Sequence, residues 1–239
     1  MQSRATTIRQ AEFDLLADQY HELHRANIAV TGEGPEYFAE YKVADLAELV
    51  RERREPASRI LDFGSGIGNS IPYFRKYFGK SSLNCADVSR RSIEVARARF
   101  PGSERYFQIE QGSIPLRAAS NDLVFSACVF HHIAHKEHDY WLAELRRLTR
   151  PGGLLAIYEH NPLNPLTVHA VRTCSLDVNA CLVGASALRQ RALRAGWRQV
   201  RIDYKVFFPS MLKILRPLEP RLGWLGLGAQ YRLTAAAPL

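Results

Sequence analysis

A short apolar segment at residues 60–70 runs directly into a glycine-rich turn, a combination that few folds accommodate. The segment reads ILDFGSGIGNS, so that the acid Asp62 comes just before Gly64, Gly66 and Gly68. Each glycine permits a backbone conformation, or a close approach, that a side chain would prevent. We therefore expect a buried strand, a tight turn and a helix whose first amide groups face a ligand.

The spacing of the three glycines separates two classes of nucleoside site. Turns that bind dinucleotides follow the pattern G-x-G-x-x-G, which leaves room for a pyrophosphate. Here Gly64, Gly66 and Gly68 alternate with other residues and follow Asp62, which favours a cofactor without phosphates. A tight strand-to-helix connection packed against a sheet would require the same glycines, so the turn alone leaves both interpretations open.

Asp87 is a second acid that points to a nucleoside site. It ends a short apolar segment at residues 83–89 and follows the glycine turn by about twenty residues, where such folds place a carboxylate on ribose hydroxyls. Asp87 and Ser89 are equally suited to begin a helix expected at 90–100, and Ser89 is a favoured N-cap residue. Both roles remain open for Asp87.

Two further strands are expected to end beside these residues. A strand at 106–109 leads into a turn at 111–116, and a buried strand that begins at Asn121 is followed by His131 and His132. In an open sheet of parallel strands, the carboxyl ends meet at one crevice where ligands bind. We therefore expect a single site that includes both histidines.

These motifs, in this order, resemble those of the class I S-adenosylmethionine-dependent methyltransferases of the small-molecule type. The resemblance covers residues 59–157, where 121–124 looks like the fourth-strand motif and 150–153 like the turn into the fifth strand. It implies an α/β fold with a doubly wound, Rossmann-like sheet of seven strands, the last one antiparallel, and an N-terminal helical cover. It also implies S-adenosyl-L-methionine as the cofactor.

The same resemblance indicates cofactor-binding residues. Tyr20 lies in an opening pattern similar to the family's and would contact the methionine part of the cofactor, unless it is a core aromatic residue. His132 would form a wall of the site, and Lys42 could reach the site or extend to solvent. The full predicted set is Tyr20, Lys42, Asp62, Gly64, Ser65, Gly66, Gly68, Asp87, Val88, Gly112, Ser113, Ile114 and His132.

The rest of the chain fits one structural domain with a helical cap. Residues 1–50 are expected to form the cap, with a helix at 11–24, and residues 51–239 the methyltransferase domain. The remaining expected elements are a helix at 37–53, strands at 154–159, 198–206 and 229–234, and a helix at 185–195.

Two insertions depart from the smallest version of this fold and would shape the acceptor pocket. The first, 161–183, opens with the turn NPLNP, where Asn161 is available as a hydrogen-bond donor. The second, 207–228, is rich in leucine and aromatic residues. It could be a lid, a dimer patch, a mouth for a lipid-like acceptor, or a helical hairpin that completes the core.

Composition bounds the class of protein. The chain has 239 residues, 46% of them hydrophobic and 23% charged, as in a soluble globular domain. Without an apolar stretch of about 18 residues or a signal peptide, we expect a cytoplasmic monomer or homodimer with no integral membrane association. The net charge of +8 comes from basic runs mixed with glutamates on expected helices, so no nucleic-acid partner is predicted. The four cysteines show no metal spacing, which favours buried, reduced thiols.

Methyl transfer mainly requires that the acceptor and the methyl group be held in line, which removes on the order of 7 to 11 kcal/mol from the barrier. A hydroxyl acceptor also needs a base. His131 and His160 are the predicted catalytic residues, with Glu159 beside them. Ubiquinone-type O-methyltransferases with a metal-assisted site carry carboxylates where this chain has Cys128 and histidines, so no metal is predicted.

The predicted function is therefore methyl transfer from S-adenosylmethionine to a small-molecule acceptor, with O-methylation favoured. One alternative is an N-methyltransferase acting on a small amine. Another is a methyltransferase-like binding module without chemistry, against which the intact glycines and Asp87 argue.

Overall fold

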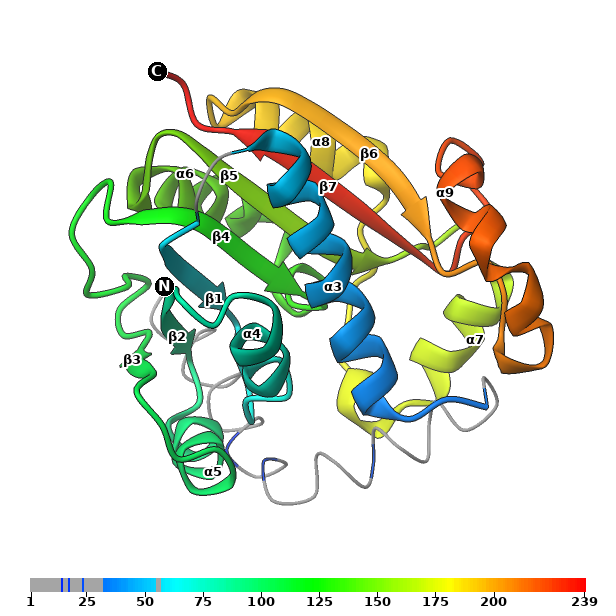
Figure 1. Cartoon of the computed structure of the whole chain (residues 1–239), viewed down its shortest axis with the longest axis horizontal. Helices are drawn as coiled ribbons and strands as arrows, with labels where there is room; N and C mark the ends of the chain where they lie inside the picture. The colour runs from blue at the N-terminus through cyan, green and yellow to red at the C-terminus, as the bar shows by residue number, and fades with distance from the viewer. Residues whose placement is uncertain (1–13, 15–16, 18–22, 24–31, 55–56) are drawn as a thin grey trace.

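The protein, described here as a computed structural model, is a sheet of seven strands between two layers of helices (Figure 1). The structure describes residues 14, 17, 23, 32–54 and 57–239. The strands are β1 (Arg59–Phe63), β2 (Ser82–Asp87), β3 (Arg105–Gln108), β4 (Asn121–Ala127), β5 (Thr149–His160), β6 (Arg198–Lys205) and β7 (Gln230–Ala236). Their order in the sheet is β3-β2-β1-β4-β5-β7-β6, and β7 is antiparallel to both of its neighbours. The predicted fold class is confirmed.

The helices cover both faces of the sheet. Those of the described residues are α3 (Pro35–Arg53), α4 (Ile71–Tyr77), α5 (Arg90–Arg99), α6 (His138–Leu148), α7 (Pro165–Thr173), α8 (Ala185–Arg194) and α9 (Glu219–Leu222), with short 3₁₀ turns η2 (Phe130–His132), η3 (His135–Glu137), η4 (Ser175–Asp177) and η5 (Ser210–Leu218). In Figure 1, α3 and α4 lie in front of the sheet and α6 and α8 behind it. Because the central strands are buried on both faces, their sequences are nearly continuous apolar runs.

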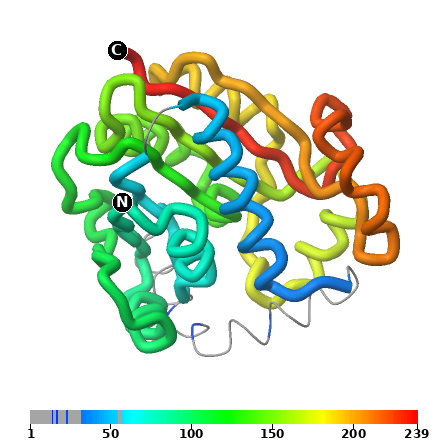
Figure 2. The backbone as a smooth tube through the Cα atoms, viewed as in Figure 1, coloured from blue at the N-terminus to red at the C-terminus, as the bar shows by residue number. Residues whose placement is uncertain are grey.

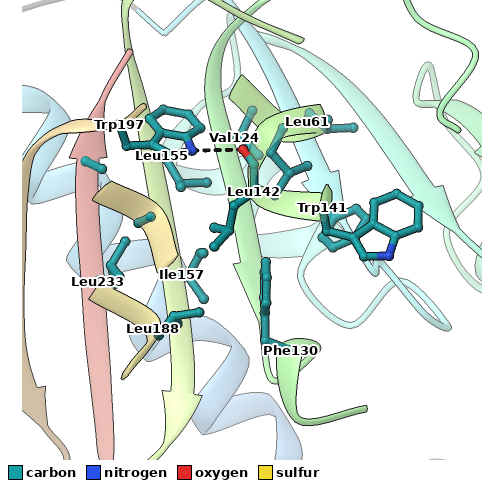
Figure 3. Close-up of a cluster of buried hydrophobic side chains, with 14 of the residues drawn as sticks. Leu61, Val124, Phe130, Trp141, Leu142, Leu155, Ile157, Leu188, Trp197 and Leu233 are labelled. Carbon is teal, nitrogen blue, oxygen red and sulfur yellow. Dashed lines mark hydrogen bonds between the residues drawn. The ribbon is translucent and has the colours of Figure 1, made fainter. Parts of the chain in front are cut away.

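Two hydrophobic clusters hold the layers together. Val43 of α3 and Phe74 of α4 pack against one face of the sheet. On the other face, Leu142 of α6 and Leu188 of α8 pack with the fully buried Trp197, whose indole Nε1 donates to the Leu142 carbonyl at 2.9 Å (Figure 3). This core places the carboxyl ends of β1, β2, β4 and β5 side by side, since these strands pair in parallel register.

The element boundaries differ from the predicted ones by one or two residues, with one larger difference. The turn expected at 150–153 lies inside β5, which begins at Thr149. Gly152 has φ of +72°, and the register against β4 shifts between Asn121 and Leu123. The chain therefore makes a bulge while it stays paired, and Arg150 Nε donates to Asp122 Oδ1 at 2.7 Å across it.

The insertion at 207–228 does not complete the core. No residue of η5 is buried, which excludes the expectation of a core-forming helical hairpin. The first insertion forms α7 and η4. Asn161, expected to be available as a hydrogen-bond donor, gives its side-chain amide to the carbonyls of Gly226 and Gly228 at 2.9 and 2.7 Å. It therefore ties one insertion to the other.

Four cysteines are present, and all are free thiols, as predicted. Cys85 and Cys174 are buried, Cys128 is half-buried and Cys181 is exposed, so the expectation of buried thiols holds for two of them. Among the described residues, no helix is both long and apolar enough to cross a membrane.

The helix expected at 11–24, with Tyr20, lies almost entirely outside the described residues. One described residue of this segment, Asp14, contacts the start of α5, where its Oδ1 accepts from Ser89 Oγ at 2.6 Å and from the Arg91 amide at 3.1 Å. Asp14 itself therefore lies at the carboxyl edge of the sheet.

Replacing Ser89 by alanine is expected to lower the free energy of unfolding by about 0.5 to 2 kcal/mol, the range for loss of an N-cap. Ser89 Oγ accepts from the Ser92 amide at 2.9 Å, as predicted from its position, and the residue is fully buried. Urea denaturation measures the change. Ser103→Ala, on an exposed loop, is the matched control, and an equal effect of both variants would contradict the capping role.

Candidate active site

The glycine turn follows β1 and is shaped by close packing on two sides. Gly64, Gly66 and Gly68 all have positive φ, at +75°, +51° and +80°. A Cβ at Gly64 would lie 2.3 Å from Cγ2 of Val129, and one at Gly68 would lie 2.8 Å from Cδ1 of Ile71. A Cβ at Gly66 would meet no atom of the described residues within 4 Å. Two glycines are therefore explained by packing, while the third faces space in which a ligand could approach the backbone.

Asp87, at the end of β2, reaches into this turn. Its Oδ2 accepts from the Gly66 amide at 2.8 Å, and its Oδ1 accepts from the Ser89 amide at 2.9 Å. Burial raises the pKa of Asp87, although these amide bonds oppose the shift. Because a carboxylate has about four lone-pair sites, these bonds leave it able to accept from a ligand as well.

Some buried polar atoms in and before the turn lack a hydrogen-bond partner among the described residues. Within the described part of the chain, Asp62 Oδ2 and Ser65 Oγ are buried and have no hydrogen-bond partner. Burial, and then the charge of Asp87, raise the pKa of Asp62 to about 8. Buried polar groups normally find a partner, so these atoms fit a site that binds a polar ligand.

The third predicted cofactor segment lies after β3. Gly112 has φ of +75°, and its carbonyl accepts from the Tyr140 hydroxyl at 2.9 Å. Ser113 and Glu110 exchange backbone hydrogen bonds across a tight turn, and the side chain of Ile114 is buried. The turn is thereby held close to the helix layer of α6.

A cluster of histidines and carboxylates lies at the ends of β4 and β5. His131 Nδ1 and Glu159 Oε2 are 2.7 Å apart, and Glu159 Oε1 accepts from the backbone amides of Val129 and Phe130 at 2.8 and 2.6 Å. On its other side, His131 Nε2 lies 3.5 Å from Oδ1 of Asp177 in η4. His131 and Glu159 are essentially inaccessible to solvent.

Two more histidines complete this cluster. The ring of His131 lies 4.1 Å from that of His132 and 5.0 Å from that of His160, measured between centroids. His132 Nε2 also lies 3.4 Å from Asp177 Oδ1. The structure thus brings together the two predicted catalytic histidines, and it adds Asp177.

The three histidines of the cluster differ in their pKa values. Burial alone would lower the pKa of His131, but Glu159 and Asp177 more than offset it and raise that pKa to about 10. Burial, together with the positive charge of His131, lowers the pKa of His160 to about 4 and that of His132 to about 3. At pH 7, His131 is therefore an imidazolium between two carboxylates, and His160 and His132 are neutral.

The cluster and the glycine turn adjoin through Val129, which contacts Gly64 and is held by Glu159. Lys42 of α3 is buried. Burial raises the pKa of Cys128 and the charge of Lys42 opposes that shift, whereas burial lowers the pKa of His160 and the charge of Lys42 adds to that shift. It therefore approaches the histidine cluster.

The same cluster contains the atoms that could hold an additional ligand. One ligand atom each from His131, His160 and Asp177 lie within 4.8 Å of one another, close enough to share a metal ion or a polar group. Sequence reasoning missed Asp177, which belongs to no motif. Its one signal is that it is the only acid between His160 and Gly184.

Comparison with known proteins gives a family for the central part of the chain. Residues 61–157 match the family model described as a methyltransferase domain. The chain is 29% identical over 140 residues to trans-aconitate 2-methyltransferase of Deinococcus radiodurans, covering 59% of this chain and 47% of that protein. It is 27% identical over 130 residues to a ubiquinone/menaquinone biosynthesis C-methyltransferase of Teredinibacter turnerae, covering 52% and 51%. The chain thus spans about half the length of these curated relatives.

Solved structures share the fold over more of the chain. A methyltransferase of Thermotoga maritima, described as S-adenosylmethionine-dependent and a possible histamine N-methyltransferase, aligns with a TM-score of 0.67 at 15% identity, covering 96% of this chain and 99% of that one. Phosphoethanolamine N-methyltransferase 2 of Haemonchus contortus, in complex with S-adenosyl-L-methionine, aligns with a TM-score of 0.59 at 18% identity, covering 82% and 53%. At these identities the likeness establishes the fold, and the acceptors named for these proteins differ from one another.

Proposed function

We propose that this chain, which belongs to the class I S-adenosylmethionine-dependent methyltransferases, transfers a methyl group from that cofactor to a hydroxyl group of a small molecule. The buried histidine cluster beside the glycine turn is the observation that carries the proposal. It supplies a neutral imidazole, a fixed positive charge and a carboxylate in one place. A hydroxyl acceptor needs such groups, whereas an unprotonated amine does not.

The residues of the turn fit the cofactor. In this proposal, Asp87 binds the ribose hydroxyls with its remaining lone pairs, and Gly66 allows the ligand to approach the backbone. The unsatisfied oxygens of Asp62 and Ser65 supply further polar contacts. S-adenosylmethionine supplies an electrophilic methyl group when it is bound. Tyr20 stays a prediction, since it lies outside the described residues.

On the acceptor side, His160 and His131 are proposed to have different roles. His160 is neutral at pH 7 because burial and the charge of His131 lower its pKa to about 4, so it can accept the proton of the acceptor hydroxyl. His131 already carries a proton, because Glu159 and Asp177 raise its pKa to about 10 in spite of burial. We assign His131 a positioning role, in which its positive charge holds Asp177 and stabilises negative charge that develops on the acceptor oxygen.

The proposal is tested by transfer of label from methyl-labelled S-adenosylmethionine into a pool of small molecules, followed by mass and NMR analysis of the product. We expect labelled product that carries the methyl group on oxygen. Gly64→Val is the negative control, because its side chain would overlap Val129 in the turn. Label on nitrogen would favour the N-methyltransferase alternative. Binding of the cofactor without any transfer would favour a binding module.

A further inference from the structure

We propose that a surface formed by residues 207–228 and the start of α7 docks this protein onto an anionic phospholipid membrane. We call it the 207–228 surface. It lies at the end of the molecule where the orange η5 and α9 segment adjoins the yellow-green α7 (Figures 1 and 2). Binding through this surface is independent of methyl transfer and can be measured without it.

Large apolar side chains stand in solvent over this surface. Met211 is 92% exposed, Ile214 is 84% exposed and Trp224 is 78% exposed. The loop before α7 and its first turn add Leu166, at 78%, and Leu163, at 67%. Exposed apolar residues scattered singly are common, but a group of this kind marks a site of interaction with a protein or a membrane.

Hydrogen bonds join the two segments into one surface. Asn164 Nδ2 donates to the Leu227 carbonyl at 2.7 Å, and Thr167 Oγ1 donates to the Ala229 carbonyl at 3.0 Å. Asn161, as described above, bonds to the carbonyls of Gly226 and Gly228. The exposed apolar side chains are therefore carried on a connected framework.

The charge of the surface indicates which kind of partner binds to it. Residues 161–173 contain no acid, and the one acid in 207–228, Glu219, is buried and accepts from the amides of Phe207 and Phe208 at 3.0 Å each. The exposed basic residues are Arg172, Lys213 and Arg221. The exposed charged side chains of these two segments are all basic, which fits an anionic lipid surface. Acids that approach from other segments are paired with arginines, Asp203 with Arg232 and Glu33 with Arg216. A second copy of the chain would bring like charges together.

The three tryptophans allow a direct test. Trp141 and Trp197 are 7% and 1% exposed, so a change in tryptophan emission on binding reports Trp224. We expect emission to shift to shorter wavelength, and the protein to sediment, with vesicles of phosphatidylglycerol and phosphatidylcholine. Both effects should weaken as salt is raised and should be small with phosphatidylcholine alone. Trp224→Phe should abolish the shift while binding is retained in part.

Variants show whether vesicle binding depends on this surface or only on the overall positive charge of the protein. The double variants Met211→Ser with Ile214→Ser, and Lys213→Glu with Arg221→Glu, should each reduce vesicle binding at least tenfold. Lys80→Glu, at an exposed site far along the chain after α4, is the matched control and should have little effect. Thermal unfolding confirms that each variant folds. No binding to anionic vesicles, or equal binding by all variants, would overturn the proposal. So would a dimer in solution that the Met211 and Ile214 changes dissociate.

Discussion

Replacing His160 by alanine is expected to lower the rate of methyl transfer about 10²- to 10⁴-fold, the usual contribution of a general base. The neutral His160 imidazole is the group proposed to take the acceptor proton. His160→Gln, which retains a polar side chain but cannot serve as an equivalent base, should show a similar loss of kcat. Cofactor affinity measured by calorimetry should stay within a few-fold of the parent in both variants. A rate near that of the parent would contradict the base role and favour an amine acceptor.

The dependence of kcat/KM on pH distinguishes His160 from His131. Burial and the charge of His131 lower the pKa of His160 to about 4, so the base is already deprotonated at pH 5.5. We expect kcat/KM to change less than about twofold between pH 5.5 and 8. A base with the unperturbed histidine pKa of about 6.5 would instead give about a tenfold rise over that range.

The variant His131→Gln tests the positioning role proposed for His131. Burial opposes protonation of His131, but Glu159 and Asp177 raise its pKa to about 10, so the variant removes a positive charge from between two carboxylates. The pKa of Asp177, lowered to about 2 by its histidine neighbours in spite of burial, should then rise. The pH profile of this variant should gain a new acidic limb, which a purely structural defect would not produce.

Replacing Asp87 by alanine is expected to weaken the binding of S-adenosylhomocysteine about 10- to 150-fold, since a hydrogen bond to a charged group is worth about 1.5 to 3 kcal/mol. The loss has two sources. The carboxylate is proposed to bind the ribose, and it also holds the Gly66 amide in the shape of the turn. Asp87→Asn should lose less, because it keeps an acceptor oxygen at the same place.

Isothermal calorimetry measures this affinity, and Glu94→Gln on the exposed face of α5 is the matched control. Thermal unfolding of each variant separates lost contacts from lost folding. Unchanged affinity in Asp87→Ala, or tighter binding of NAD than of S-adenosylhomocysteine, would contradict the assignment of this crevice.

The glycine turn and its contact with Asp87 could be predicted from sequence because their geometry is local. Gly64, Gly66 and Asp87 lie within one strand–turn–helix–strand unit, and the positive φ values that the turn needs restrict the residue types that can occupy it. The histidine cluster depends on contacts between distant segments. Asp177 lies in a 3₁₀ turn of an insertion, and only the packing of that insertion brings it to His131.

The 207–228 segment shows a different limit of sequence reasoning. Its leucines, isoleucine and tryptophan are what a buried hairpin would contain, and apolar content alone does not say whether they face the core or the solvent. Pro217 lies within η5, and Leu212 has non-helical φ and ψ, so the segment forms no continuous helix with a single packed face. The exposure of these side chains is a property of the tertiary structure.

The position of β7 has a consequence for synthesis. It lies between β5 and β6 and makes all of the pairing of β6 with the sheet. During translation, β6 and one edge of β5 therefore stay unpaired until residues 230–236 have left the ribosome. Unpaired strand edges promote aggregation and misfolding. We therefore expect chaperones to bind most strongly to nascent chains that have been stalled before residue 230, in which these strand edges are unpaired.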